Sequence, residues 1–483
     1  MGNPKTPDDV SLGGETAKGT AAKFVTLGVG FVGSIVLARS LGPAAYGGFY
    51  ALLAIVEIVD RPIRGWATAG KKRASESGAD RDQIATTLIS ALAVFLGIIS
   101  AGALLAGDVL RSYADLSAAV PMFIALLVTT TLYVTIRALV TSRGLIGLAT
   151  WTNTIRNGTA VPLQILFAVP LGFGLGAAGM AYGYAAGTLL VVPMVAYYAK
   201  VRPETPTWET VRSLWGYAKY SIPSGFLGRV YSRFDLLLIG ALVGPASVGY
   251  YEIAYRISLP ATFLSTVAAS ALLPRVSFRA TDSKSFTTDV ASVLSYSSLL
   301  SLPIFFGAVV IANDLVIVLY GTDYTGAGLL LIGIALYRIV KSQSGPLKSV
   351  VDGIDRPDYN LRLSAITLLL NVLLGVILIL EYGAIGVVVA TVIAESFRYL
   401  GLCWFLRREV PELRLYSRPI LEQAFAAAAM CLLVLAALEL TSFSRTVEVG
   451  FALVLGAVSY ASFLLVGSSY HRSLLQSSVN ALR

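Results

Sequence analysis

Apolar stretches of about 20 residues, each long enough to cross a lipid bilayer, follow one another along almost the whole 483-residue chain. Only 13% of the residues are charged, against roughly 25% in soluble domains, so most of the surface must face lipid. The sequence predicts an all-α polytopic membrane protein of fourteen spanning helices. They are expected near residues 20–38, 46–66, 84–107, 117–140, 152–171, 175–198, 219–242, 247–274, 287–311, 327–350, 361–380, 384–405, 420–440 and 447–467.

The chain carries the same local pattern twice, about two hundred residues apart. Residues 42–47 read Gly-Pro-Ala-Ala-Tyr-Gly, and residues 244–249 read Gly-Pro-Ala-Ser-Val-Gly. A second echo, Gly-x-x-Gly, opens the sixth segment at Gly176 and the twelfth at Gly383. Duplicated halves are typical of alternating-access transporters. We therefore expect four parts: an N-terminal six-helix bundle (1–199), a cytoplasmic linker (200–216), a C-terminal six-helix bundle (217–406), and two further helices with a cytoplasmic tail (407–483).

Two interpretations of the linker remain open. Trp208, Val211, Trp215 and Ala218 recur at helical spacing, which favours a short interfacial helix anchored by tryptophan. An ordinary polar connection explains the same residues.

Basic residues gather in every second loop. With the N-terminus in the cytoplasm, the outer loops hold only Arg39, Arg111 and Arg445. The inner loops hold Lys71, Lys72, Arg73, Arg81, Arg143, Lys200, Arg202, Arg212, Arg275, Arg279, Lys284, Arg356, Arg407, Arg408, Arg414 and Arg418. This bias predicts a multi-pass protein of the plasma membrane with both termini in the cytoplasm. Because the net charge of +9 lies in short loops and forms no soluble basic patch, we expect no nucleic-acid partner.

The second segment carries four ionisable residues on one broad face: Glu57, Asp60, Arg61 and Arg64. Glu57–Arg61 and Asp60–Arg64 have the i,i+4 spacing of helical ion pairs, and Pro62 predicts a kink among them. Ionisable groups inside spanning helices are costly and usually face a protein interior or an aqueous cavity. The residues therefore form either a charged cavity wall or a self-neutralised helix end.

The seventh segment adds Arg229 and Arg233 on one face, with a single aspartate, Asp235. Two like charges on one face are unfavourable unless an anion meets them. The eighth segment adds Glu252 and Arg256, which are either a simple intrahelical pair or part of the same site. Since guanidinium groups match phosphate oxygens, such a cavity suits a phosphate or diphosphate head.

Other polar residues are assigned structural roles. We expect Arg137, Arg156, Arg338 and Lys341 to snorkel toward the cytoplasmic surface, and Glu395 and Arg398 to pair. The only histidine, His471, is expected in the solvated tail, and Cys403 and Cys431 lie in apolar runs. No catalytic residue, metal site or cofactor is predicted.

Residues 229–256 read RVYSRFDLLLIGALVGPASVGYYEIAYR, and residues 37–52 read LARSLGPAAYGGFYAL. These stretches resemble polysaccharide and O-antigen flippases of the multidrug/oligosaccharidyl-lipid/polysaccharide exporter superfamily. The matching residues of the first stretch are Asp235, Gly240, Gly244, Val248, Gly249 and Tyr251. The resemblance implies two six-helix bundles in a V plus two C-terminal helices. It also implies a flippase, not an enzyme, whose substrate is an oligosaccharide linked to polyprenyl (dolichyl or undecaprenyl) phosphate or diphosphate. Archaeal relatives serve protein N-glycosylation, and bacterial relatives serve surface polysaccharide.

The expected mechanism follows from these charges. Arg61, Arg64, Arg229, Arg233 and Arg256 meet the phosphate head, the lipid tail stays in the bilayer, and the bundles rock to open outward. Glu57, Asp60, Asp235 and Glu252 are candidates for ion coupling, although voltage alone can assist an anion leaving the cytoplasm. We expect a monomer, working with membrane lipid and with glycosyltransferases or an oligosaccharyltransferase of the same pathway. The alternatives are a multidrug or cation antiporter of the same superfamily, or a membrane glycan polymerase or ligase.

Overall fold

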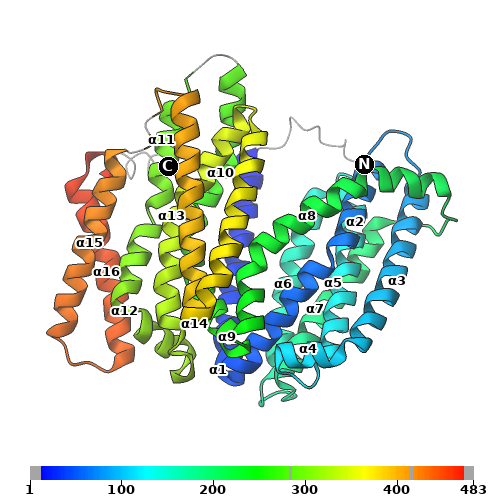
Figure 1. Ribbon diagram of the computed structural model, residues 1–483, viewed down its shortest axis with the longest axis horizontal. Helices are drawn as coiled ribbons and strands as arrows, with labels where there is room; N and C mark the ends of the chain where they lie inside the picture. The colour runs from blue at the N-terminus through cyan, green and yellow to red at the C-terminus, as the bar shows by residue number, and fades with distance from the viewer. Residues whose placement is uncertain (1–11, 282–284, 414, 416, 473–483) are drawn as a thin grey trace. The chain divides into compact units, whose positions relative to one another are not determined.

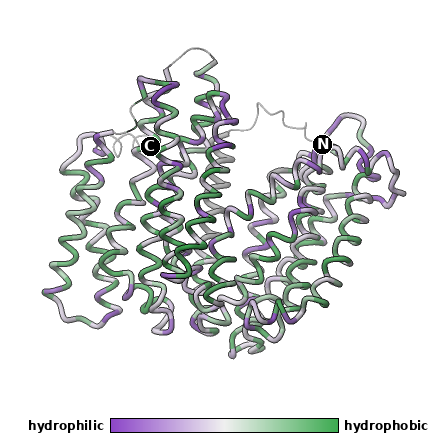
Figure 2. The backbone as a smooth tube through the Cα atoms, viewed as in Figure 1, coloured by the Kyte–Doolittle hydropathy of each residue, from purple (hydrophilic) through white to green (hydrophobic). Residues whose placement is uncertain are grey.

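The computed structural model describes residues 12–281, 285–413, 415 and 417–472, and the helices in these ranges form two compact units divided after Gly249. Lys284 and Arg414, two of the loop cations counted above, lie outside these ranges. In Figure 1 the long helices of each unit run side by side. Figure 2 shows hydrophobic residues along the helix shafts and most hydrophilic residues near their ends, as a bilayer requires.

The first unit consists of eight helices. They are α1 (Leu12–Val59), α2 (Arg61–Ala74), α3 (Arg81–Leu105), α4 (Gly107–Ala114), α5 (Ala119–Ser142), α6 (Ile146–Ala168), α7 (Gly176–Ala199) and α8 (Trp208–Leu242). α7 packs closely on α6 because Gly179, Gly183 and Gly187 form a stripe at fourfold spacing. A Cβ at Gly187 would lie 2.4 Å from the Cα of Ala160, so only glycine allows this approach.

The second unit begins within α9 and includes the C-terminal helix pair. Its elements are α9 (Pro245–Ser258), η2 (Leu259–Thr262), α10 (Phe263–Thr281), α11 (Thr287–Ser298), α12 (Ser301–Tyr320), η3 (Thr322–Tyr324), α13 (Ala327–Gly353), α14 (Pro357–Glu409), α15 (Arg418–Glu439) and α16 (Arg445–Gly467). Apolar side chains of α12, α15 and α16 form one of its cores, which includes Met430, Val434 and Leu464.

All fourteen expected segments coincide with helices, so the prediction of an all-α polytopic membrane protein is confirmed. Among the described residues, nine helical stretches are long and apolar enough to cross a membrane, and two of these, Gly28–Val59 and Pro357–Glu409, each contain parts of two expected segments. The remaining three segments correspond to α6, α8 and α13, which are long enough but more polar.

The repeated glycines mark the points where the chain turns between segments. Gly42 and Gly244 have φ angles of 74° and 116°, and Gly176 and Gly383 both have 59°. Residues with a Cβ rarely adopt positive φ, whereas glycine does so freely. Each sequence echo therefore preserves a backbone turn, which explains why these glycines occur in both halves.

The two copies of the Gly-Pro-Ala pattern also touch each other. A Cβ added at Gly47 would lie 1.8 Å from the carbonyl oxygen of Pro245, and one added at Gly249 would lie 2.4 Å from that of Pro43. The start of α9 therefore packs backbone to backbone on the corresponding turn of α1. The contact lies within the first unit.

Residues 208–216, for which a short interfacial helix was one interpretation, form the first turns of α8 and pack on α2. The rings of Trp66 and Trp215 are 6.2 Å apart, and Ser221 donates a hydrogen bond to the carbonyl oxygen of Gly65. By these contacts α8 belongs to the first unit, although it opens the expected C-terminal bundle. The expected boundaries at residues 199, 216 and 406 stay a prediction.

Candidate functional site

The helix that carries the first set of charges is interrupted at Asp60. α1 ends at Val59, and α2 starts at Arg61 with Pro62 in its first turn, where the missing N–H of proline costs no helical hydrogen bond. The predicted kink is thus confirmed. It concentrates Asp60, Arg61 and Arg64 at the joint between two helices.

Asp60 is fully buried and pairs with both neighbouring arginines. Arg61 Nε donates to Asp60 Oδ1 at 2.8 Å, and Arg64 Nε donates to Oδ2 at 2.6 Å. The expected i,i+4 pair between Asp60 and Arg64 is confirmed. A buried carboxylate that accepts from two guanidinium groups is well compensated, so it fixes both arginines in place.

Glu57 pairs with another helix. Arg233 Nε on α8 donates to Glu57 Oε2 at 2.6 Å, and Arg229 Nη1 lies 3.6 Å from the same oxygen. The expected pair between Glu57 and Arg61 is wrong, because Arg61 bonds the adjacent Asp60 and Glu57 lies near the end of α1, which packs on α8. The spacing rule considers one helix at a time and cannot detect a partner 176 residues away.

These contacts define the α2–α8 charge cluster, named after the helices that carry its arginines. It consists of Glu57 near the end of α1, Asp60 at the joint, Arg61 and Arg64 on α2, and Arg229 and Arg233 on α8. Its ion pairs join four guanidinium groups to two carboxylates. The side chains of Arg64, Arg229 and Arg233 are 24–30% exposed, so they remain accessible to a ligand. Asp235 lies nearby in sequence on α8 and is partly buried. A cationic excess at accessible guanidinium groups can bind phosphate oxygens.

The remaining two predicted residues are described with the second unit. Arg256 Nε donates to Glu252 Oε1 at 2.9 Å, and the Glu252 side chain is only 6% exposed. The intrahelical pair is therefore confirmed. The structure brings together four of the five predicted arginines in one unit.

A second buried cluster, which the sequence did not single out as a site, joins α13 and α14. Lys341 Nζ and Arg398 Nη1 each lie 3.4 Å from an oxygen of Glu395, and Ser344 donates to the same carboxylate. The Glu395–Arg398 pair is confirmed, whereas Lys341 does not extend to the surface alone as expected. The sequence signal that could have indicated this cluster is the spacing of Lys341 and Ser344, which places both residues on one face of α13.

Arg338 and His471 also differ from expectation. Arg338 is 5% exposed and does not snorkel to the cytoplasmic surface. His471 is 7% exposed and belongs to a hydrogen-bonded network, so it is not a solvated tail residue. Both were misassigned because burial depends on neighbouring helices that sequence position does not reveal.

The His471 network ties the end of the chain to α11 and α15. Gln423 Nε2 lies 3.0 Å from His471 Nε2, and His471 Nδ1 lies 2.8 Å from Ser468 Oγ. The Gln423 amide also donates to the carbonyl oxygen of Ser295 and accepts from Ser298. Burial lowers the pKa of His471 below its usual value, although nearby Glu422 opposes the shift. Burial therefore favours the neutral imidazole.

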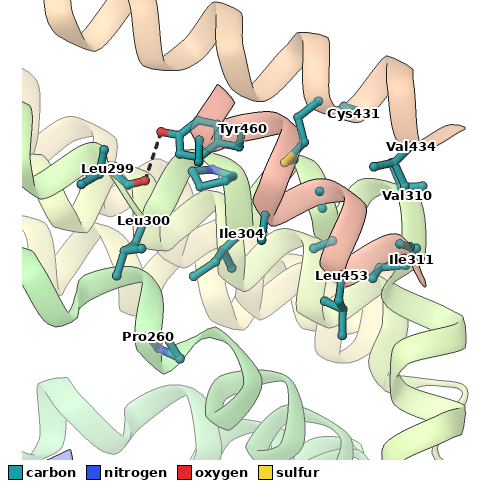
Figure 3. A pocket seen from close by; sticks show the side chains of 18 of the residues that line it. Pro260, Leu299, Leu300, Ile304, Val310, Ile311, Cys431, Val434, Leu453 and Tyr460 are labelled. Atoms are coloured by element: carbon teal, nitrogen blue, oxygen red, sulfur yellow. Dashed lines mark hydrogen bonds between the residues drawn. The ribbon is translucent and has the colours of Figure 1, made fainter. Parts of the chain in front are cut away.

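An apolar cavity of about 740 Å³ lies in the second unit, bordered by α12, α15 and α16 (Figure 3). Ile304, Ile311, Val434 and Leu453 contribute to its walls. The Tyr460 hydroxyl, which also lines it, donates to the carbonyl oxygen of Leu299 at 3.1 Å. The walls offer almost no hydrogen-bonding groups, so the cavity suits a hydrocarbon chain.

Within the described ranges, no group of three or more His, Cys, Asp or Glu side chains could hold a metal ion. Solved structures with a similar fold include the lipid II flippase MurJ in an inward closed conformation, with a TM-score of 0.76 and 15% identity over 95% of this chain and 100% of that one. A multidrug resistance MATE family transporter in an inward-facing conformation has a TM-score of 0.63 and 17% identity over 80% and 95%. At these identities the likeness shows the fold alone.

Two relatives from Haloferax volcanii are similar in sequence. The probable low-salt glycan biosynthesis flippase Agl15 is 28% identical over 77% of this chain and 79% of its own length. The probable flippase AglR is 26% identical over 63% and 64%. Residues 36–328, more than half of the chain, match the family described as polysaccharide biosynthesis protein. The chain therefore belongs to the polysaccharide biosynthesis protein family.

Proposed function

We propose that this protein is a flippase that moves an oligosaccharide linked to polyprenyl phosphate or diphosphate from the cytoplasmic to the outer leaflet by alternating access. The glycan serves surface polysaccharide or protein N-glycosylation. One observation carries the proposal: in a member of this family, the α2–α8 charge cluster presents four arginines, three of them partly exposed, on membrane helices.

The chemistry of the cluster favours an anionic substrate. Placing an ionisable residue at the centre of a spanning helix costs about 2.5–3.5 kcal/mol on insertion scales, so four arginines on two helices require a compensating role. Asp60 and Glu57 hold the guanidinium groups in place, and their charge offsets only part of the total. A phosphate or diphosphate supplies the remaining negative charge and the oxygen acceptors. Arg256, in the second unit, stays a predicted phosphate-binding residue.

The apolar cavity offers a place for part of the lipid. Its volume of about 740 Å³ is within the range of small-molecule sites, and aliphatic walls favour an isoprenoid chain over a sugar. We propose that part of the isoprenoid tail enters this cavity while the rest stays in the bilayer.

The energy source and surroundings belong to the same proposal. The protein acts as a monomer in the plasma membrane with both termini in the cytoplasm, next to the glycosyltransferases or oligosaccharyltransferase of its pathway. With an inside-negative potential, each negative charge moved outward releases about 2.3 kcal/mol per 100 mV. Glu57, Asp60, Asp235 and Glu252 are the carboxylates that could couple an ion.

The test is flipping of a lipid-linked oligosaccharide in vesicles that contain the purified protein. Changing Arg229 and Arg233 together to Gln should slow flipping by roughly tenfold or more, since each charge-assisted hydrogen bond contributes about 1.5–3 kcal/mol. Arg111→Gln is the matched control, because the Arg111 side chain on α4 is exposed and pairs with exposed Asp108. Full flipping by a folded double variant would remove the cluster from the substrate site.

The same vesicles separate the alternatives. An antiporter would move cationic drugs and leave the glycolipid in place. A glycan polymerase or ligase would change the oligosaccharide itself, which mass spectrometry of the recovered lipid would reveal. A flippase changes only the leaflet in which an intact glycolipid is found.

A further inference from the structure

The helix that follows the second Gly-Pro-Ala turn is interrupted in the middle of its span. The stretch Pro245–Ala280 is long and apolar enough to cross a membrane. Within it, α9 ends at Ser258, the 3₁₀ turn η2 covers Leu259–Thr262, and α10 begins at Phe263. Pro260 lies inside the turn. Interrupted helices at membrane depth expose backbone and hydroxyl groups, and they commonly form transporter binding sites.

Arg338, in the middle of α13, lies against this interruption. Its Nε donates to Ser258 Oγ at 3.3 Å, and its Nη1 donates to Thr262 Oγ1 at 3.4 Å. The Tyr255 ring covers one face of the guanidinium at 4.3 Å from the ring centre. Ile257 and Pro260 of the same segment line the apolar cavity. The interruption thus borders both a cation and an apolar space.

The positive charge of Arg338 is poorly compensated. The residue is 5% exposed, its Nη2 has no hydrogen-bond acceptor, and no carboxylate of the described ranges forms an ion pair with it. Its two hydrogen bonds are longer than the roughly 2.7–2.9 Å of charge-assisted bonds. By contrast, Arg256, Lys341 and Arg398 of the same unit each have a carboxylate partner.

We propose that Arg338 is a substrate-binding residue of the second unit, which takes an oxyanion of the translocated lipid-linked glycan on its Nη2 edge. The oxyanion is a phosphate oxygen of the carrier or an acidic group of the glycan. Binding in the guanidinium plane leaves Tyr255 on the face and needs only a displacement of the side chains that bury Nη2. Hydrogen-bond geometry is poorer in the 3₁₀ turn η2 than in an α-helix, and such turns often mark hinges.

The inference rests on the proposed function, so two kinds of measurement are needed. The first uses purified full-length protein in detergent, with farnesyl diphosphate as a lipid phosphate probe and oligogalacturonate as an acidic glycan probe. Arg338→Met should weaken binding of one of them by roughly tenfold or more, the size of one lost charge-assisted hydrogen bond. Arg338→Lys should recover part of the loss. The affected probe identifies the source of the oxyanion.

A structural role predicts a different result. If Arg338 only holds helices together, Arg338→Met lowers the unfolding temperature without any probe. If Arg338 instead binds the substrate, the unfolding temperature of Arg338→Met stays the same or rises, because the substitution removes a buried uncompensated charge. Arg156→Met is the control: the Arg156 guanidinium also lies near tyrosine rings, those of Tyr133 and Tyr184. Although its Nε has no acceptor, its Nη1 and Nη2 have close acceptors at 2.9 and 3.1 Å. It should lose stability and keep probe affinity.

Flipping in vesicles completes the test. Arg338→Met should flip the lipid-linked glycan at least tenfold more slowly than the wild type. A variant that flips at the wild-type rate, or wild-type affinity of the variant for both probes, overturns the inference. Failure of the wild type to bind either probe overturns it as well. If the wild-type protein itself does not flip the glycolipid, the proposed function is wrong. This outcome differs from one in which the wild type flips the glycolipid and Arg338→Met flips it equally fast, which overturns only the inference about Arg338.

Discussion

Asp60 shows how single buried residues organise the charges of this protein. It is fully buried between Arg61 and Arg64. Asp60→Asn keeps the shape of the side chain but leaves two arginines without their carboxylate. We expect a loss of about 3–5 kcal/mol in unfolding free energy, the usual cost of breaking a buried pair. Thermal unfolding in detergent measures it.

The control for this prediction is Asp108→Asn. Asp108 pairs with Arg111, but its side chain is 98% exposed, so the change should cost less than about 1 kcal/mol. If Asp60→Asn is no more destabilising than the control, then solvent reaches Asp60 and the cluster is not fixed by it.

His471 predicts a dependence of stability on pH. Its pKa is lowered in the folded protein, so below about pH 6.5 the unfolded chain binds more protons than the folded one. Stability from this residue is complete above pH 6.5 and is lost as the pH falls toward the folded pKa. Protonation would also place an N–H against the Gln423 amide, which already donates to His471 Nε2 in the neutral form.

The measurement is the unfolding temperature at pH 7.5 and pH 5.5. The wild type should lose more stability over this interval than His471→Gln, which cannot titrate. An equal pH dependence in both proteins would show that the imidazole is not held neutral. Glu422 must be kept unchanged in both, since its charge opposes the shift.

Among the elements, the turns that begin with Gly42 and Gly244 contact each other through backbone atoms. A small substitution can therefore test how much their close packing stabilises the protein. Gly47→Ala would place a Cβ 1.8 Å from the carbonyl oxygen of Pro245, so the two turns must separate. We expect a loss of about 1–3 kcal/mol, as for other overpacked positions. Slower flipping should accompany it, because the contact joins α1 to α9.

Gly450→Ala is the control for Gly47→Ala. Gly450 lies within α16 with no atom within 4 Å of an added Cβ, so alanine should be neutral or stabilise the helix. A Gly47→Ala protein as stable as this control would show that the two turns separate at no cost.

The elements were largely predictable from the sequence because they depend on local properties. Apolar length placed all fourteen segments, and the repeated glycines marked turns with positive φ at Gly42 and Gly244. The short helix α4 was missed because its eight residues are far fewer than the roughly 20 apolar residues by which spanning segments were recognised. The interruption at residues 259–262 was missed because the stretch Pro245–Ala280 as a whole is long and apolar enough to be taken for one spanning segment.

The charge partners were predictable only within a helix. The pairs Asp60–Arg64 and Glu252–Arg256 follow from i,i+4 spacing, and both are present. The pairing of Glu57 with Arg233 depends on how α8 is rotated against α1, which spacing does not encode. The burial of Arg338 likewise depends on the helix packed opposite. Tertiary packing therefore decides which charges form a site.

At the scale of the whole molecule, the distribution of loop charge predicts the orientation in the membrane. Inner loops concentrate Lys and Arg, whereas outer loops carry few, so both termini should be cytoplasmic. Cysteine labelling tests this directly. Ser77 follows α2 in an expected inner loop, and Ser442 lies between α15 and α16 in an expected outer loop; both are exposed.

The two native cysteines, Cys403 and Cys431, are buried. Replacing both by alanine removes any background labelling of these thiols by the maleimide. In that protein, a membrane-impermeant maleimide should label Ser442→Cys in intact cells and Ser77→Cys only after permeabilisation. If the maleimide labels Ser77→Cys but not Ser442→Cys in intact cells, the topology is the inverse of the predicted one. Inversion would place the loops rich in Lys and Arg outside the cell, so the predicted cytoplasmic position of both termini would be wrong.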